Sequence, residues 1–142
     1  MPLVFLSLGS NIGDRKSNIK KAIKLLKDEG IKIGRLSKII ETKPQGGPPQ
    51  PKFLNAAISI RTELPPRGLL KTLKIIEKMM GRSKGVRFGP RVIDLDILLY
   101  GDLKLKSKQL EIPHPRMWER QFVLGPLYSL ISPAKLKKFK GI

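Results

Sequence analysis

The stretch RFGPRVIDLDILLYGD, residues 87–102, alternates acidic and apolar residues at its centre. Such alternation predicts a β-strand, in which successive side chains point to opposite faces of a sheet. Asp94 and Asp96 then share one face, with Cα atoms roughly 6.5–7 Å apart at about 3.3 Å rise per residue. Two carboxylates at this spacing can converge on one or two hard cations, and their oxygen ligands suit magnesium. The opposite, core-facing side of the strand is predicted to carry Leu95, Ile97 and Leu99.

A loop rich in glycine and basic residues precedes this strand. Acids that hold a metal, next to bases that hold phosphate, indicate a nucleotide site. A solvated strand face beside a basic loop accounts for the same residues equally well, so both interpretations stay open here. Glu77, close to Arg82 at the end of a predicted helix, is more typical of an ordinary helix-end charge. The loop contains Arg82, Lys84, Arg87 and Arg91, interrupted by Gly85, Gly89 and Pro90.

Length and composition predict one domain over residues 1–142, with 40% hydrophobic residues to build its core. No apolar run approaches the roughly 20 residues that span a bilayer, and the start MPLVFLSLGSN has no charged leader. We therefore expect a cytoplasmic protein. The absence of cysteine excludes disulfides and thiolate metal sites, and the single His114 excludes a multi-histidine metal centre.

The chain carries 29 Lys and Arg against 11 Asp and Glu, which gives a net charge of +18. Such a charge attracts polyanions in general, including nucleic acids, nucleotides and acidic membrane surfaces. Most of the lysines fall on the polar faces of predicted helices and in the C-terminal tail, where solubility explains them. We therefore expect no membrane partner and do not favour nucleic acid as a partner. A basic nucleic-acid-binding module without catalysis remains the alternative function.

Hydrophobic periodicity predicts a regular succession of strands and helices. Asp14 is a good N-cap for the first helix, and Gly30 and Gly81 are typical helix stops. The strands are predicted at 3–8, 31–41, 53–62 and 94–100, and the helices at 14–30 and 65–80. They are followed by a β-like segment at 103–112, a helix around 117–124 and a basic tail without a core pattern.

The order strand, helix, strand, strand, helix, strand is typical of an α+β, ferredoxin-like βαββαβ sheet. Both helices of such a sheet cover one face, so we expect the other face to be open. The loop at 42–51 contains four prolines and two glycines and is longer than the usual connection of about 4–6 residues. A loop of this length favours a functional role, and we expect the active site on the open face beneath it.

Alternation along the strand at 53–62 places Phe53 and Asn55 on the same open face as Asp94 and Asp96. Phe53 can stack on a planar ring, and Asn55 can offer it both a donor and an acceptor. These residue types predict a pocket for a flat polar heterocycle beside a metal-bound phosphate. The alternative is that Phe53 packs under the proline-rich loop and Asn55 satisfies backbone groups there.

Other phosphate and catalytic motifs are absent from the sequence. The glycines at the end of the first strand are not followed by a Walker Gly-Lys-Ser/Thr, and no G-x-G-x-x-G or G-x-S-x-G occurs. Lys84-Gly85 supplies only the first two positions of an RNP1 string. Phosphate chemistry must therefore use another arrangement.

With these residues in place, the chain resembles hydroxymethyldihydropterin pyrophosphokinase, an enzyme family of folate biosynthesis. Several independent motifs in the family's order and spacing are far more specific than any one of them, and they span nearly the whole chain. Two departures are Phe88, where tryptophan is common, and Lys84, where arginine is common. The matching stretches are LSLGSNIGDR at 6–15, ETKPQGGPPQPKFLNAA at 41–57, IEKMMGR at 76–82, RFGPRVIDLDILLYGD at 87–102 and IPHPRMWERQFVLGPL at 112–127.

The resemblance implies a monomeric, magnesium-dependent transferase that moves the β,γ-diphosphate of ATP to the hydroxymethyl oxygen of a reduced pterin and releases AMP. It implies that Asp94 and Asp96 hold two Mg²⁺ ions and, with Arg82 and Arg91, form the catalytic set. The loops at 42–51 and 81–91 would close over both substrates. The implied ATP-binding residues are Glu77, Arg82, Lys84, Arg91, Ile97, His114 and Arg120, and the implied pterin-binding residues are Thr42, Pro44, Phe53, Asn55, Asp94 and Phe122.

Overall fold

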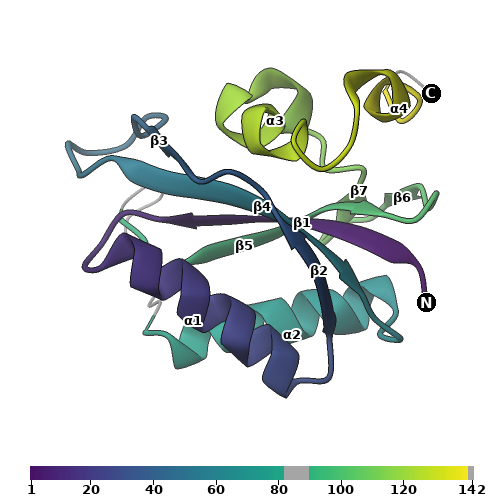
Figure 1. Ribbon diagram of the computed structural model, residues 1–142, viewed down its shortest axis with the longest axis horizontal. Helices are drawn as coiled ribbons and strands as arrows, with labels where there is room; N and C mark the ends of the chain where they lie inside the picture. The colour runs from purple at the N-terminus through teal and green to yellow at the C-terminus, as the bar shows by residue number, and fades with distance from the viewer. Residues whose placement is uncertain (82–89, 141–142) are drawn as a thin grey trace.

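The computed structural model describes residues 1–81 and 90–140. Its centre is an antiparallel five-stranded sheet, and two further short strands pair separately as a hairpin (Figure 1). The strands are β1 (Leu3–Ser10), β2 (Lys32–Leu36), β3 (Ile40–Thr42), β4 (Phe53–Arg61), β5 (Asp94–Tyr100), β6 (Leu105–Lys106) and β7 (Glu111–Ile112). The helices are α1 (Arg15–Asp28), α2 (Pro66–Met79), the 3₁₀ turn η1 (Met117–Glu119), α3 (Gln121–Leu127) and α4 (Pro133–Lys137).

The strands lie in the order β2-β4-β1-β5, with β3 pairing to the start of β4. Each helical crossover therefore skips one strand: β4 lies between β1 and β2, and β1 lies between β4 and β5. Both crossover helices, α1 and α2, cover the same face of the sheet (Figure 1). This topology confirms the predicted ferredoxin-like α+β fold.

The ends of α1 follow from local sequence chemistry. The Asp14 side chain accepts a hydrogen bond from the Ser17 N–H at 3.1 Å, which caps the first turn as predicted. Gly30 has φ +81°, a left-handed conformation that glycine adopts without a Cβ penalty. Gly81 closes α2 in the same way, with φ +93°.

The single strand predicted at 31–41 is wrong, because the structure divides it into β2 and β3. Two serine side chains replace backbone partners where the chain bends. The Arg35 N–H donates to Ser59 Oγ at 2.8 Å, and Ser37 Oγ accepts from the Ala57 N–H at 2.7 Å. The register of β2 against β4 shifts between Ile33 and Leu36, so one continuous ladder does not form.

The main core lies between the sheet and the two crossover helices. The predicted apolar stripes of both helices are buried there, with Leu26 of α1 and Leu73 of α2 at 0% exposure. From the sheet, β5 contributes Leu95 and Ile97 to the same cluster. Burial of these side chains is the dominant favourable term in stabilising the fold.

A second core covers much of the face that was predicted to be open. There α3, α4 and η1 pack on the sheet (Figure 1), so that prediction is wrong for this part of the face. The helix predicted around 117–124 is instead η1 followed by α3, and the tail predicted to lack a core pattern contains α4. The buried members of this cluster are Phe5, Ala57, Leu98, Leu99, Met117, Val123, Leu124, Leu127 and Leu136.

A bulge in β5 explains why two consecutive leucines enter the second core. Phe5 pairs with Leu99 and the next residue, Leu6, pairs with Ile97, so Leu98 has no partner in the β1 register. The extra residue reverses the alternation beyond this point. Leu99 therefore lies in the second core. The alternation had placed it in the main core instead, so that prediction is wrong for Leu99.

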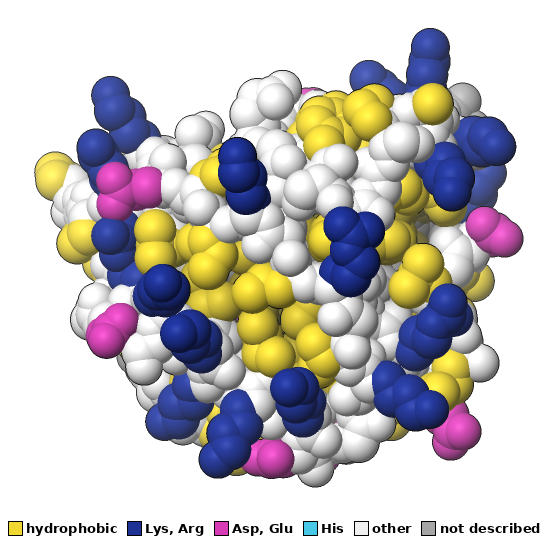
Figure 2. Space-filling model, in the orientation of Figure 1, with side chains coloured by type: hydrophobic (Ala, Val, Ile, Leu, Met, Phe, Trp, Pro, Cys, Tyr) yellow, Lys and Arg dark blue, Asp and Glu magenta, His cyan; other side chains and the backbone are white. Residues whose placement is uncertain are grey.

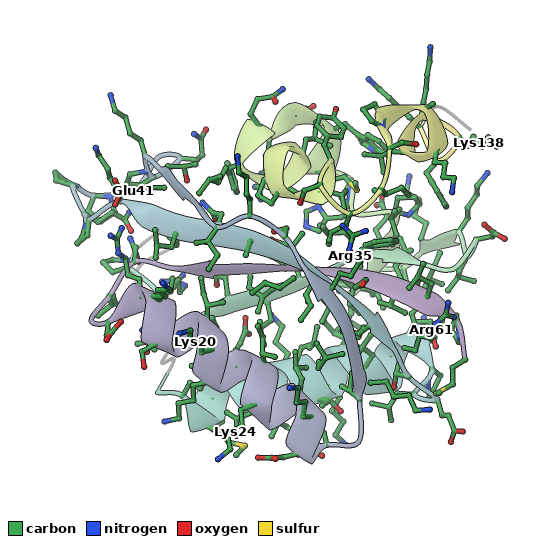
Figure 3. All side chains as sticks on the ribbon, in the orientation of Figure 1. Lys20, Lys24, Arg35, Glu41, Arg61 and Lys138 are labelled. Carbon is green, nitrogen blue, oxygen red and sulfur yellow. The ribbon has the colours of Figure 1, made fainter. Side chains whose placement is uncertain are left out.

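On the face that carries α1 and β2, the basic side chains of the described residues are spread apart (Figure 2). Figure 2 shows Lys and Arg across the face that carries α1 and β2, with hydrophobic surface between them. Figure 3 shows that Lys20 and Lys24 project from α1 toward solvent, and both are exposed, as expected for the polar face of this helix. Among the described residues, no helix is long and apolar enough to cross a membrane.

The second core yields a prediction for the tail. Leu136 is 2% exposed and packs into that core, so we expect Leu136→Ala to lower the free energy of unfolding by about 2–5 kcal/mol in urea titrations. The neighbouring exposed Lys137→Ala is the control and should change it by less than about 0.5 kcal/mol. Equal stabilities for the two variants would contradict the docking of α4.

Candidate active site

A cavity of about 330 Å³ opens on the second face of the sheet, between the loop after β3 and the N-terminal end of α3. Its floor is formed by β1, β4 and β5, and its size lies in the range of small-molecule sites. The residues that line it are Ser7, Gly9, Thr42, Lys43, Pro44, Gln45, Phe53, Asn55, Lys74, Glu77, Arg91, Asp94, Asp96, Leu98, His114, Arg120, Phe122 and Val123.

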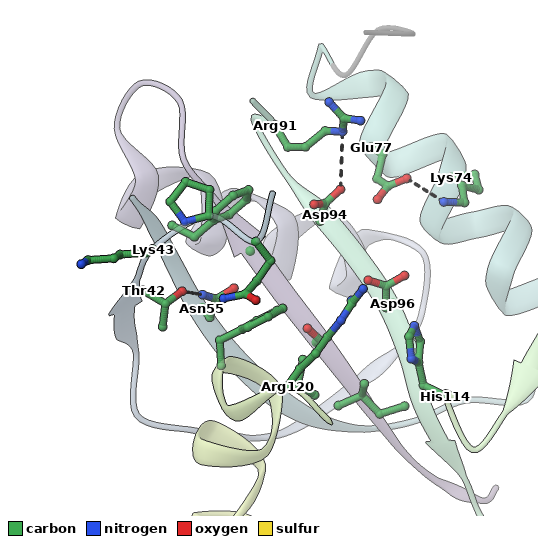
Figure 4. A pocket seen from close by; sticks show the side chains of 18 residues that line it. Thr42, Lys43, Asn55, Lys74, Glu77, Arg91, Asp94, Asp96, His114 and Arg120 are labelled. Carbon is green, nitrogen blue, oxygen red and sulfur yellow. Dashed lines mark hydrogen bonds and ion pairs between the residues drawn. The ribbon is translucent and has the colours of Figure 1, made fainter. Parts of the chain in front are cut away.

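The acidic pair lies on the floor of this cavity, upstream of the bulge. Asp94 and Asp96 pair with Gly9 and Ser7 of β1, so the two carboxylates share one face as the alternation predicts. Figure 4 shows Asp94 beside the Arg91 guanidinium, whose Nε lies 4.0 Å from Asp94 Oδ1, and Asp96 beside Arg120 and His114. Asp94 is 35% exposed, so a ligand in the cavity can reach it.

The donor set fits a hard divalent cation. The described residues contain no group of three or more His, Cys, Asp or Glu placed to hold a metal ion. The protein would therefore supply two carboxylates, and a substrate or water would supply the remaining oxygen ligands. Mg²⁺ is typically bound in this way, through one or two carboxylates together with substrate phosphates.

Glu77 is not the ordinary helix-end charge that the sequence suggested. It is 3% exposed, and its Oε2 accepts a hydrogen bond from the Leu95 N–H at 2.8 Å. Its Oε1 lies 3.3 Å from Lys74 Nζ. The carboxylate thus joins α2 to the edge strand β5 at the peptide between the two aspartates.

His114 and Arg120 converge on Asp96, on the side of the acidic pair away from Arg91 (Figure 4). The backbone N–H of His114 donates to the Leu98 carbonyl at 3.0 Å. The ring Nδ1 of His114 accepts from the backbone N–H of Arg116 at 3.2 Å. Burial lowers the pKa of His114 below its ordinary value. Asp96 and Glu111 act against this shift, while Arg120 and Arg116 add to it.

The other end of the cavity carries the aromatic and amide side chains. Asn55 is 5% exposed, and its Nδ2 donates to the Thr42 hydroxyl, so a side chain of β3 holds this amide. Phe53 and Phe122 line the same end. The Arg120 guanidinium lies 5.6 Å from the centre of the Phe122 ring, within the range of a cation–π contact. One arginine thus borders both ends of the cavity.

Gly9 was not predicted as a site residue, although the cavity depends on it. A Cβ at this position would lie 3.0 Å from Asn55 Oδ1 and 3.6 Å from Phe53 Cδ1. Any larger residue would displace the amide that faces the cavity. The sequence signal was the glycine at the end of β1, which was interpreted only as the end of a strand.

Asn11 was also missed, and it ties two loops together. It is 1% exposed, and its Nδ2 donates to Gln50 Oε1 at 2.8 Å and to the Pro51 carbonyl at 2.9 Å. Its Oδ1 accepts from the Arg91 N–H at 2.8 Å. This buried amide therefore holds the end of the 42–51 loop against Arg91, three residues before β5 begins.

Most of the predicted site residues meet in this one cavity. Ile97 is an exception, because it is 3% exposed in the main core, while the bulged Leu98 lines the cavity instead. Arg82 and Lys84 lie outside the described residues. The predicted residues that the cavity brings together are Thr42, Pro44, Phe53, Asn55, Glu77, Arg91, Asp94, Asp96, His114, Arg120 and Phe122.

Known proteins resemble the chain in sequence over nearly its whole length. Residues 5–132 match the family model described as 7,8-dihydro-6-hydroxymethylpterin-pyrophosphokinase. The chain is 45% identical over 126 residues to the Bacillus subtilis 2-amino-4-hydroxy-6-hydroxymethyldihydropteridine pyrophosphokinase, covering 88% of this chain and 75% of that protein. It is 42% identical over 147 residues to the Aquifex aeolicus protein of the same name, covering 99% of this chain and 91% of that one.

Longer proteins match as well. The chain is 51% identical over 131 residues to the mitochondrial folate synthesis bifunctional protein of Pisum sativum, covering 92% of this chain but only 25% of that protein. It thus spans about a quarter of the length of the plant relatives it matches.

The fold also matches solved structures. A Plasmodium falciparum HPPK-DHPS crystal structure superposes with a TM-score of 0.69 at 18% identity, over 92% of this chain and 40% of that one. At this identity the superposition supports the fold alone. The family match over residues 5–132, together with the identities above, confirms the resemblance drawn from the motifs. The chain belongs to the 7,8-dihydro-6-hydroxymethylpterin-pyrophosphokinase family.

Proposed function

We propose that this chain transfers the β,γ-diphosphate of ATP to the hydroxymethyl oxygen of 6-hydroxymethyl-7,8-dihydropterin, giving the pterin diphosphate and AMP. The observation that carries the proposal is the position of Asp94 and Asp96 in the cavity, with Arg91 on one side of the pair and Arg120 and His114 on the other, and with aromatic and amide side chains at one end (Figure 4). The names of its bacterial relatives agree with this activity.

The aromatic and amide end is suited to a pterin. Phe53 and Phe122 offer ring faces for stacking, and Asn55 offers a carbonyl and an amide to the edge of a planar heterocycle. Because the Thr42 hydroxyl holds the amide, Asn55 is oriented before a ligand arrives. Thr42 and Pro44 would complete the slot from the loop side.

The basic side chains that flank the acidic pair are suited to a triphosphate. Arg91, Arg120 and His114 would surround the phosphates and offset the negative charge that develops as the diphosphate moves. Asp94 and Asp96 would hold two Mg²⁺ ions, which when bound neutralise oxygens at the attacking and leaving ends of an in-line displacement. Arg82 and Lys84 stay predicted phosphate ligands in this scheme.

Water must be excluded while both substrates are bound, because it would otherwise attack ATP. Asn11 would hold the end of the 42–51 loop in place, since it hydrogen-bonds Gln50, Pro51 and Arg91 together. A monomeric state and a cytoplasmic location stay predictions.

The direct test mixes protein, ATP, Mg²⁺ and 6-hydroxymethyl-7,8-dihydropterin and follows AMP. We expect AMP only when all the components are present, and omission of Mg²⁺ should abolish it. AMP formation that does not depend on the pterin would reject the proposed function. The alternative, nucleic-acid binding without catalysis, predicts RNA affinity that falls steeply with salt and no turnover.

Asp96→Ala tests the acidic pair. The variant removes a carboxylate from the cavity floor and leaves both cores unchanged, so turnover should fall roughly a thousandfold, the upper range for loss of one preorganised electrostatic group. The measurements are steady-state AMP formation and a thermal unfolding curve. A folded variant with near-normal turnover would show that the metal assignment is wrong.

The single histidine gives a clean pH prediction for the metal-free protein. Because the pKa of His114 is lowered on folding, its imidazole proton resonance should titrate with a midpoint below about 6.5, the value of an unperturbed histidine. Arg120→Gln should raise that midpoint, and Asp96→Asn should lower it further.

The stability consequence of this shift has a defined sign. Below about pH 6.5 the unfolded chain binds a proton at His114 more readily than the folded chain does. The free energy of unfolding therefore decreases as pH falls from about 6.5 to the folded pKa of His114. Below the folded pKa, protonation of His114 causes no further change in stability. A midpoint at or above 6.5 in the NMR titration would contradict the burial of this ring.

A further inference from the structure

Glu77 is a third carboxylate in the cavity wall, and the resemblance implies that it lies among the ATP-binding residues. It projects from α2 and is 3% exposed, while the charged group of Lys74 on the same helix is largely exposed. A buried charge is costly unless it is paired and hydrogen-bonded. The contacts that offset this cost therefore indicate its role.

One contact of Glu77 is with the edge of the sheet. Because β5 is the last strand in the order β2-β4-β1-β5, its outward N–H groups have no neighbouring strand among the described residues to accept them. The Leu95 N–H is such a group, and Glu77 Oε2 accepts its hydrogen bond at 2.8 Å. Hydrogen bonds to an ionised acceptor are stronger than neutral ones.

The position of Leu95 gives this contact its significance. Leu95 is the residue between Asp94 and Asp96, and its N–H belongs to the peptide that links it to Asp94. Any rotation or shift of this peptide would change the distance and orientation of one aspartate relative to the other. On its other side β5 is held by β1, where Leu8 pairs with Leu95.

We propose that Glu77 is a positioning residue: by holding the Leu95 peptide, it sets the spacing of the Asp94 and Asp96 carboxylates for a divalent cation. This inference rests on the proposed function only for its effect on turnover. Lys74, whose Nζ lies 3.3 Å from Glu77 Oε1, supplies a positive charge beside it and lines the same cavity (Figure 4). Groups that orient metal ligands in this way typically contribute about 10–100-fold to metal affinity or activity.

Three substitutions separate the possible contributions of Glu77. Glu77→Gln keeps the length of the side chain and one carbonyl acceptor but removes the charge. Glu77→Asp keeps the charge but shortens the side chain by one methylene, so the acceptor no longer reaches Leu95. Glu77→Leu removes the acceptor altogether and fills a similar volume.

The matched control is Ser37→Ala. Ser37 is 7% exposed, and its Oγ accepts the Ala57 N–H at 2.7 Å, so it makes the same type of side-chain contact to a strand backbone. It lies outside the cavity. Ser37→Ala should therefore lower stability without changing the response to Mg²⁺.

The primary readout is a titration of Mg²⁺ into ¹⁵N-labelled protein, following the amide shifts of Asp94, Leu95 and Asp96. We expect the midpoint to rise about 10–100-fold in Glu77→Leu and Glu77→Asp, and to stay near the wild-type value in Glu77→Gln and Ser37→Ala. In the AMP assay the same two variants should lose kcat and need more Mg²⁺, with the KM for pterin unchanged.

The outcomes are distinguishable. Coinciding Mg²⁺ midpoints for wild type and Glu77→Asp would overturn the positioning role, and a loss confined to Glu77→Gln would indicate that the charge alone matters. An equal loss in Glu77→Gln and Glu77→Asp would also overturn it, because a neutral acceptor of unchanged length should still hold the Leu95 N–H. If Glu77→Leu does not fold, the comparison of Gln with Asp decides. If wild type makes no AMP, the proposed function fails, while the amide titration still tests Glu77.

Discussion

The alternation of side chains along β5, and its single interruption, determine where everything else in the site lies. Up to Ile97 the strand sends apolar residues into the main core and Asp94 and Asp96 to the opposite face. At the unpaired Leu98 the alternation reverses, and Leu98 and Leu99 both enter the second core. One strand therefore supplies two cores and the cavity floor, because a one-residue shift exchanges the two faces of a strand.

The second core explains why the site is a walled cavity and not an open sheet face. The helices α3 and α4 bury apolar residues over the end of β5 that follows the bulge, and their cover stops before the aspartates. Arg120, at the N-terminal end of α3, borders this limit and lines the cavity. The segment that contains α3 thus covers part of this face and also supplies Arg120 as a basic wall for the uncovered part.

The sequence was sufficient for features that depend on period and composition. The apolar stripes of α1 and α2 repeat over several turns, so one exception does not hide them. The capping residues and the shared face of the acidic pair follow from residue type and from the two-residue period of a strand. The missed features each depend on one contact. The bulge needs one extra residue, α4 buries Leu136 among lysines, Gly9 matters only beneath Asn55, and the burial of Glu77 depends on where α2 meets the edge of β5.

The charges of the cavity restrict its ligand more than its shape does. Asp94 and Asp96 would repel a bare triphosphate, while Arg91, Arg120 and the excess positive charge of the chain would disfavour a lone cation. A polyanion that brings divalent cations with it satisfies both sets of residues at once. In the proposed reaction, the spacing of the two carboxylates would set where the cation, and with it the phosphate chain, lies relative to the aromatic end.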